Sequence, residues 1–312
     1  MKTKKIFIVG CSGTIGETTL KMLSTETDHE IVGSCFELPN YFNDISLNIH
    51  KVSSLRFKEL RKIILKEKPN VIVNCSGISD PVFAEANKKL TWDLNVKLVE
   101  HLVSISKVLE AHLITFSCEW VFDGNKGPYK EDDRPNPINY LGKSKLAAEN
   151  FVQTNINFYS IIRLPLVYGV LGKTDFVRKI IAANMEKGYT LPLKYTTNPV
   201  WADEVAWGIM KIIDMELTGI FHFGGANIVN VRDFVDYIRI FIKQDLTPVN
   251  LRPPILFSSG EIKIFGLQTA LSQALLSMKF TSVVNGLYNY FSQYRTRSFD
   301  YLDGFDRLIE LL

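Results

Sequence analysis

The stretch Lys4–Gly16, KKIFIVGCSGTIG, decides the fold of this chain. Its first part, up to Gly10, is a short apolar run with the length and composition of a buried strand. A glycine-rich loop follows directly, and helical periodicity begins at Glu17. A G-x-x-G-x-x-G loop that stands between a strand and a helix is typical of dinucleotide-binding folds. The alternative interpretation is a plain strand-to-helix loop without a ligand.

Each residue of this loop has a separate expected task in holding a dinucleotide. Gly10 permits a tight turn, Gly13 lets the backbone approach a pyrophosphate, and Gly16 lets the following helix pack close to the sheet. Thr14 and Ile15 open that helix, whose N-terminus favours an anion. We therefore predict that these five residues bind the cofactor.

Downstream of the loop, strand-like apolar runs alternate with helical periodicity. The predicted strands are Glu30–Cys35, Val71–Cys75, His112–Ser117 and Phe158–Leu164, and the predicted helices are Phe57–Lys66, Trp92–Leu109 and Lys143–Thr154. This alternation indicates parallel strands with crossover helices, and so an α/β fold with a Rossmann-type doubly wound parallel sheet. Ligands of such sheets bind at the carboxyl ends of the strands. Cys75, Ser76 and Gly77 are therefore predicted to contact the cofactor.

The choice between NAD and NADP depends on the residues after the second predicted strand. Glu37 follows Gly16 by 21 residues, close to the spacing at which an acidic residue binds the adenine ribose of NAD. No Lys or Arg lies between Gly33 and His50 to meet a 2′-phosphate. NAD is therefore favoured over NADP, although Glu37 also fits a solvated loop carboxylate.

The composition narrows the functional classes. The 312 residues are 46% hydrophobic with a formal net charge of +3, and the basic residues are dispersed, which does not favour nucleic-acid binding. No apolar run approaches the ~18 residues of a membrane span, and the run near the N-terminus is too short for a signal peptide. The four cysteines lack metal-site spacing. We therefore expect no metal, and reduced thiols in a cytoplasmic protein.

A second stretch, Phe116–Asn150, carries a resemblance to a known family. It reads FSCEWVFDGNKGPYKEDDRPNPINYLGKSKLAAEN. It resembles the dTDP-4-dehydrorhamnose reductase (RmlD-like) branch of the extended short-chain dehydrogenase/reductases. That branch reads roughly S-T-D-Y-V-F-D-G, then Y-x-E-D, then P-x-N-x-Y-G-x-S-K-L-x-x-E. The matching residues are Ser117, Val121, Phe122, Asp123, Gly124, Tyr129, Glu131, Asp132, Pro137, Gly142, Ser144, Lys145, Leu146 and Glu149.

The resemblance implies a catalytic Tyr–Lys pair, of which this chain keeps the lysine. Lys145 matches the family's Lys, which holds the nicotinamide ribose and lowers the pKa of a Tyr four residues earlier. Leu141 replaces that Tyr, and Cys118 replaces the Thr or Ser that steadies the substrate oxygen. Tyr140, Cys118 or a bound water is left to supply the proton. On a regular helix, however, Tyr140 and Lys145 lie about 140° apart around the axis.

The resemblance also implies the ligands and the domain organisation. Asn48 and Ile49 match an Asp-Ile/Leu pair that touches adenine in the family. Residues 1–165 are expected to form the NAD(P)-binding domain, with returning segments from about 196–225, and residues 166–312 mainly the substrate-binding region. The expected substrate is a sugar nucleotide, and a homodimer is possible. The tail Tyr294–Leu312 lies outside the family pattern and predicts a short amphipathic helix.

Two functions are open at this point. One is an NAD(P)-dependent reductase of a 4-keto-6-deoxy sugar nucleotide with an altered proton donor. The other is a catalytically inactive member that serves as a nucleotide-binding regulatory or partner subunit, as another member of the branch does. The intact surroundings of Lys145 favour the enzyme, whereas the loss of both hydroxyls, at positions 118 and 141, favours the binding protein.

Overall fold

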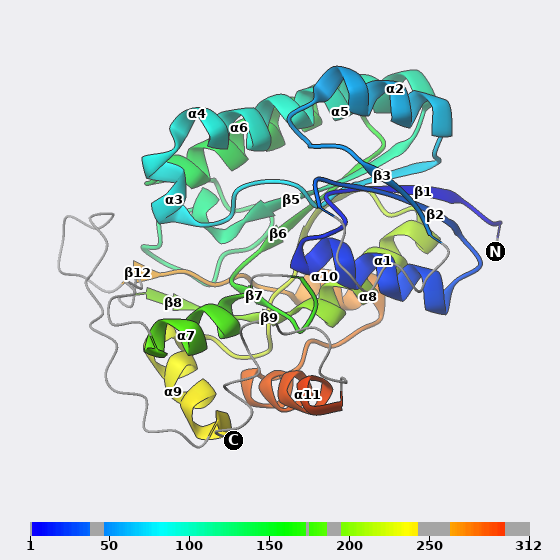
Figure 1. Cartoon of the computed structure of the whole chain (residues 1–312). Helices are drawn as coiled ribbons and strands as arrows, with labels where there is room; N and C mark the ends of the chain where they lie inside the picture. The colour runs from blue at the N-terminus through cyan, green and yellow to red at the C-terminus, as the bar shows by residue number, and fades with distance from the viewer. Residues whose placement is uncertain (1, 38–46, 173–174, 186–194, 243–262, 297–312) are drawn as a thin grey trace.

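A seven-stranded parallel sheet in the order β10-β6-β5-β4-β1-β2-β3 forms the centre of the computed structural model (Figure 1). Its strands are β1 (Lys5–Val9), β2 (Glu30–Cys35), β3 (Asn48–Lys51), β4 (Val71–Asn74), β5 (His112–Cys118), β6 (Tyr159–Leu164) and β10 (Gly219–His222). The structure describes residues 2–37, 47–172, 175–185, 195–242 and 263–296. The strand order reverses between β1 and β4, as in other doubly wound sheets. The predicted α/β class and Rossmann-type sheet are confirmed.

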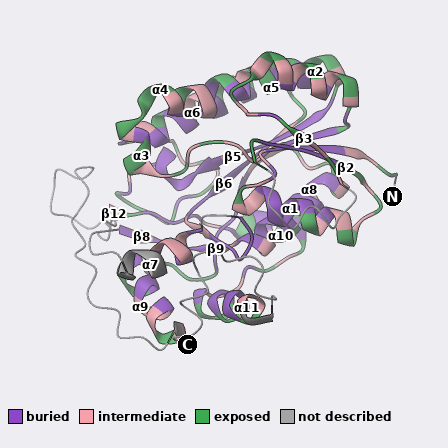
Figure 2. Cartoon of the chain, viewed as in Figure 1, coloured by how far each residue is buried: buried purple, intermediate pink, exposed green. Residues whose placement is uncertain are grey.

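Helices cover both faces of this sheet (Figure 1). One layer holds α2 (Phe57–Glu67), α5 (Leu98–Leu109) and α6 (Tyr140–Asn155), and the other holds α1 (Thr14–Glu26), α8 (Ala202–Met215) and α10 (Ala270–Leu276). In β1, Ile6 and Ile8 pack into one core while Phe7 and Val9 pack into the other. Because both faces are covered, the central strands are mostly apolar and mostly buried (Figure 2).

A smaller second part lies beside the sheet, in the lower half of Figure 1. It contains β7 (Val167–Tyr168), β8 (Tyr195–Thr197), β9 (Val200–Trp201), β11 (Val229–Asn230), β12 (Lys263–Ile264), α7 (Phe176–Met185), α9 (Val231–Ile242) and α11 (Val283–Thr296). Its own core includes Tyr168, Phe234 and Leu287. The chain returns from this part through α8, and β10 pairs with β6 at the edge of the sheet.

The helix that carries Lys145 begins earlier than the sequence predicted. α6 starts at Tyr140 because the side chain of Asn139 caps it, accepting a hydrogen bond from the Gly142 N–H at 2.8 Å. A buried ion pair ties the same helix to the sheet. Arg163 of β6 donates to the two carboxylate oxygens of Glu149 at 3.0 and 2.8 Å, and each side chain is 2% exposed.

Two other segments depart from the predicted pattern. Between β4 and α5 the chain forms α3 (Pro81–Ala86), α4 (Lys88–Trp92) and a π-helix (Asp93–Lys97), so the predicted helix Trp92–Leu109 is divided. At the other end, Tyr294 to Thr296 belong to α11, and the rest of the predicted tail helix lies outside the described residues. Within the described ranges, no helix is long and apolar enough to cross a membrane.

Candidate active site

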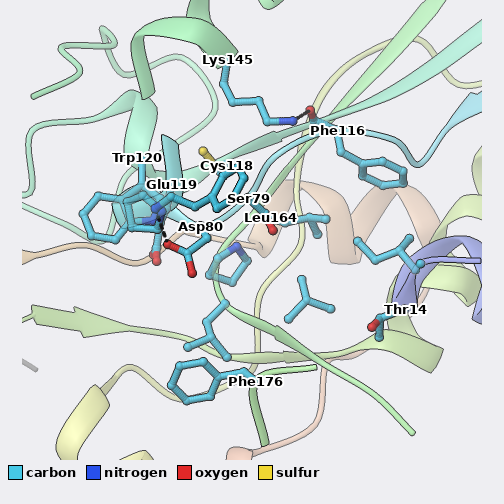
Figure 3. Close-up of a pocket in the computed structure, with 18 of the residues that line it drawn as sticks. Thr14, Ser79, Asp80, Phe116, Cys118, Glu119, Trp120, Lys145, Leu164 and Phe176 are labelled. Atoms are coloured by element: carbon cyan, nitrogen blue, oxygen red, sulfur yellow. Dashed lines mark hydrogen bonds between the residues drawn. The ribbon is translucent and has the colours of Figure 1, made fainter. Parts of the chain in front are cut away.

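A cavity of about 720 Å³ opens at the carboxyl ends of β1, β4, β5 and β6. One side is lined by the glycine-rich loop at Gly13–Ile15 and by the segment after β4 at Cys75–Gly77. The opposite side is lined by Trp120, Glu119 and Asp80, and Lys145 reaches in between them (Figure 3). Eight of the predicted site residues therefore line a single cavity: Gly13, Thr14, Ile15, Cys75, Ser76, Gly77, Cys118 and Lys145.

The two remaining glycines of the loop act by bringing backbone segments into close contact. Gly10 has a φ of +77°, and a Cβ there would lie 2.3 Å from the Ser76 hydroxyl oxygen. A Cβ on Gly16 would lie 2.3 Å from the carbonyl oxygen of Gly10. Gly13 caps α1 and lines the cavity, and the nearest atom to a Cβ there would be 3.8 Å away. The first turn of α1 is thus accessible to a diphosphate, and these residues fit a dinucleotide.

The contrast between these glycines gives a stability prediction. Gly16→Ala is expected to lower the free energy of unfolding by about 1–3 kcal/mol, because its Cβ clashes with a backbone oxygen that cannot rotate away. Gly13→Ala is the matched control, and its stability should remain within about 0.5 kcal/mol of the parent. Urea unfolding of both variants measures the difference. Equal stabilities would contradict the close packing of the loop.

Lys145 is a cation that lines the cavity, and it is almost completely buried. Its Nζ donates a hydrogen bond to the Phe116 carbonyl oxygen at 3.1 Å (Figure 3). A Cβ on Gly77 would lie 3.1 Å from this Nζ, so the glycine makes room for the ammonium group. Burial lowers the pKa of Lys145, opposed by the nearby Cys118 and Glu149. The ammonium group has donors left over for ribose hydroxyls, as the resemblance implies.

The two substituted positions behave differently in the structure. Leu141 is fully buried in a cluster with Ala84, Cys118 and Trp120, and it does not line the cavity. Cys118 does line the cavity, but burial raises the pKa of its thiol to about 12. A thiol is also a weak hydrogen-bond donor. The wall of the cavity near Lys145 therefore offers no phenol from position 141 and only a weak donor from position 118.

The structure does not bring Tyr140 into the cavity. Its backbone N–H donates to Glu85 at 2.7 Å, and the Nζ of Lys88 lies 5.5 Å from the centre of its ring. Because α6 begins at Tyr140, this residue has a fixed helical position five residues before Lys145, on a different side of the helix. The geometry thus does not favour the expectation that Tyr140 supplies the proton.

The residues expected to contact adenine lie at the start of a short edge strand. Asn48 and Ile49 are the first two residues of β3, and Asn48 lies beside Val32 in the middle of β2. Strand residues rise about 3.3 Å each, so Asn48 is roughly 10 Å from the carboxyl end of its own strand. Ligands of such sheets bind at that carboxyl end, so this position does not favour an adenine contact, which stays a prediction for both residues. A strand of four residues is too short for its ends to be predicted from the sequence pattern.

Two other residues beyond the strand ends are better placed. Ser54 follows β3, and its hydroxyl shares a hydrogen bond with the Ser76 hydroxyl at 2.6 Å, which connects it to the wall of the cavity. Glu37 lies two residues past the end of β2 and is exposed. Its contact with the ribose stays a prediction.

Sequence reasoning passed over a buried carboxyl group in the cavity. Glu119 is 1% exposed, and the hydroxyl of Thr197 lies 2.9 and 2.7 Å from its two carboxylate oxygens. Burial raises the pKa of Glu119 to about 8, although hydrogen bonds from Thr197 and the Gly266 backbone lower it. The signal was present in the motif, because the family pattern has an acidic residue directly after its Thr. The burial of Glu119 and its contact with Thr197, however, cannot be read from the sequence.

Aromatic side chains form the wall next to this carboxyl group. The ring of Trp120 packs against Tyr195 and Phe265, with centroid distances of 5.1 and 4.7 Å. Trp120, Tyr195 and Phe176 line the cavity. Flat apolar rings beside a few polar groups are typical of small-molecule sites.

Comparisons with known proteins agree with this geometry. A family model described as the RmlD substrate binding domain matches residues 4–253. The probable low-salt glycan biosynthesis reductase Agl14 of Haloferax volcanii is 29% identical over 247 residues, which cover 77% of this chain and 81% of that protein. Methionine adenosyltransferase 2 subunit beta of Xenopus laevis is 28% identical over 234 residues, which cover 72% of this chain and 67% of that protein.

A solved structure gives the same result for the fold. The dTDP-4-dehydrorhamnose reductase from Bacillus anthracis, in complex with NADP, has a TM-score of 0.78 and 22% sequence identity to this chain. The match covers 94% of this chain and 100% of that one. The range matched by the family model includes both the glycine-rich loop and Lys145.

Proposed function

Because the chain belongs to the family of the RmlD substrate binding domain, we propose that it is an NAD-dependent reductase of a nucleotide-linked 4-keto-6-deoxy sugar. The observation that carries this proposal is the single cavity in which the first turn of α1, Lys145 and the Trp120–Tyr195 wall meet. A dinucleotide at α1 and a sugar at the aromatic wall would then have their reacting atoms near Lys145.

Each part of the cavity has a task in this proposal. When bound, the reduced nicotinamide supplies a hydride to the carbonyl carbon. The N–H groups of the first turn of α1 bind the pyrophosphate. Lys145 donates to the ribose hydroxyls and fixes the ring next to Cys118 and Phe116. The rings of Trp120 and Tyr195 pack on the sugar and exclude water from the reacting atoms.

The test of the proposal is a direct assay. Purified protein is titrated with NADH, and the dTDP-, UDP- and GDP-linked 4-keto-6-deoxyhexoses are then added while nicotinamide absorbance is followed. Oxidation of NADH that requires one of these sugars is the expected result. NADH binding without oxidation by any of the three would contradict the reductase and would favour a ligand-binding subunit instead.

The cofactor preference gives a separate prediction. NADH should bind more tightly than NADPH, because the Glu37 carboxylate can accept a bond from the ribose 2′-hydroxyl but repels a 2′-phosphate. Glu37→Arg is expected to reverse the preference by about tenfold or more. Glu26→Arg, which adds the same charge at the exposed end of α1, is the matched control. Fluorescence titration with both nucleotides measures the ratio, and an unchanged ratio in Glu37→Arg would remove Glu37 from the site.

A further inference from the structure

A ketone reductase must deliver a proton to the substrate oxygen as well as a hydride to the carbon. The family's donor position holds Leu141, which does not line the cavity, and Tyr140 contacts α3 and α4 instead. We propose that Glu119, as a neutral carboxylic acid, is the proton donor of this site. The inference rests on the proposed reductase function and names the residue that replaces the missing phenol.

The position of Glu119 suits this role. It is the first residue of a 3-10 helix (Glu119–Val121) that directly follows β5, so it is the neighbour of Cys118. Cys118, Glu119 and Lys145 line the same cavity (Figure 3). In the family the residue at position 118 touches the reacting oxygen. The next residue in the chain begins only about 3.8 Å further on, so the Glu119 side chain starts close to that oxygen.

The surroundings of Glu119 keep its proton in place at neutral pH. The groups that face it are Cys118 on β5, Tyr195 on β8, Asp80 at the start of α3 and, further off, Lys145 on α6. Burial is the dominant effect and raises the pKa of Glu119 to about 8. At pH 7 most molecules therefore carry the neutral acid, the form that can donate.

The proposed step is balanced in atoms and electrons. The hydride from NADH forms the new C–H bond, and the electron pair of the carbonyl π bond moves to oxygen. The Glu119 O–H bond breaks, and its proton forms the O–H bond of the product alcohol. The carboxylate left behind accepts hydrogen bonds from the Thr197 hydroxyl and the Gly266 backbone N–H, which stabilise its charge. Solvent returns the proton when the product leaves.

The other acidic groups that line the cavity are less suitable. Burial raises the pKa of Tyr195 well above its usual value, so its phenol keeps its proton. Asp80 caps α3, where one carboxylate oxygen accepts hydrogen bonds from the Val82 and Phe83 N–H groups. Asp175 lies 3.0 Å from the Arg178 guanidinium, which holds it in an ion pair.

Three variants test the inference through the pH dependence of kcat with NADH and the sugar substrate identified by the assay above. In the parent, kcat should fall as pH rises through about 8, because the donor loses its proton. This decrease is the alkaline limb of the pH profile. Glu119→Gln should lower kcat by about 10²- to 10⁴-fold and remove this limb. Thr197→Val removes a hydrogen bond to the carboxylate and should shift the limb to higher pH. A residue with only a structural role would not move the limb.

Glu204→Gln is the matched control. Glu204 is also a buried glutamate whose pKa burial raises, to about 7, but it lies on α8 outside the cavity. This variant should keep both the rate and the pH limb of the parent. A limb that survives in Glu119→Gln, or that disappears in Glu204→Gln, would overturn the inference while leaving the reductase itself intact.

A second measurement does not need turnover. Infrared difference spectra of the parent against Glu119→Gln should contain the C=O band of a protonated carboxylic acid at pH 7, and that band should disappear as pH rises past about 8. An ionised Glu119 at pH 7 would overturn the inference whichever substrate is used. If the band is present and the parent oxidises NADH with none of the three sugars, the reductase assignment fails, and the donor role fails with it.

Discussion

Replacing Leu141 by Tyr and Cys118 by Thr is expected to raise reductase activity, and most strongly in a Glu119→Gln background. Position 141 is four residues before Lys145, so the two side chains lie on the same side of α6. A phenol there would extend past the volume of Leu141 toward Cys118 and the cavity. In the Glu119→Gln background we expect a gain of about 10²- to 10⁴-fold, the usual contribution of a positioned general acid.

The control for this gain is Leu141→Phe with Cys118→Thr. Phenylalanine places the same ring in the buried cluster, and so has the same packing cost, but it has no proton to donate. The readout is kcat for NADH oxidation, with cofactor binding measured separately. If the Tyr variant binds NADH and gains nothing over the Phe variant with any of the 4-keto sugar nucleotides, the substrate assignment is wrong.

Glu149→Ala is expected to lower the free energy of unfolding by about 3–5 kcal/mol. The substitution leaves the Arg163 guanidinium buried without its carboxylate, and a buried unpaired charge is strongly destabilising. His222 lies 3.3 Å from this guanidinium and cannot replace Glu149 as an anion. Burial lowers the pKa of that imidazole to about 3, so it is neutral. Urea unfolding monitored by circular dichroism measures the change.

Two controls separate charge from packing in this experiment. Asp93→Ala breaks the ion pair of Asp93 with Lys97 (2.8 Å), in which half of the Lys97 side chain is exposed, and should destabilise the protein far less. The double variant Glu149→Met with Arg163→Met fills similar volume without charges and should recover most of the lost stability. A loss in Glu149→Ala as small as that in Asp93→Ala would mean that water enters and solvates Arg163.

The layered sheet could be predicted because its signal is local. Apolar runs such as Lys5–Val9 read as strands on their own, and their alternation with helical periodicity is sufficient to predict parallel pairing. The glycine-rich loop could likewise be predicted, since its function depends on backbone geometry within seven residues. Element boundaries that depend on weak local signals could not be predicted. The start of α6 depends on one cap by Asn139, and the bounds of the short strand β3, which place Asn48 at its first position, could not be derived from the sequence.

The acid–base character of the site could not be predicted from the sequence. Glu119 was visible as an acidic residue in a motif, but its raised pKa results from burial, which outweighs the lowering by hydrogen bonds from Thr197, 78 residues later in the chain, and from Gly266. In the same way, nothing near Tyr140 in sequence indicates that it lies against Lys88 and Glu85. Periodicity predicts which face of a helix is buried, but not which distant group meets it.

The position of β10 has a consequence for synthesis on the ribosome. This strand, Gly219–His222, pairs with β6, yet it is translated only after β7, α7, β8, β9 and α8. Until then the nascent chain exposes β6 as an unpaired edge, a surface that invites pairing with other chains. Expression of residues 1–165 alone would leave β6 permanently unpaired, so this segment is not a natural unit for separate expression.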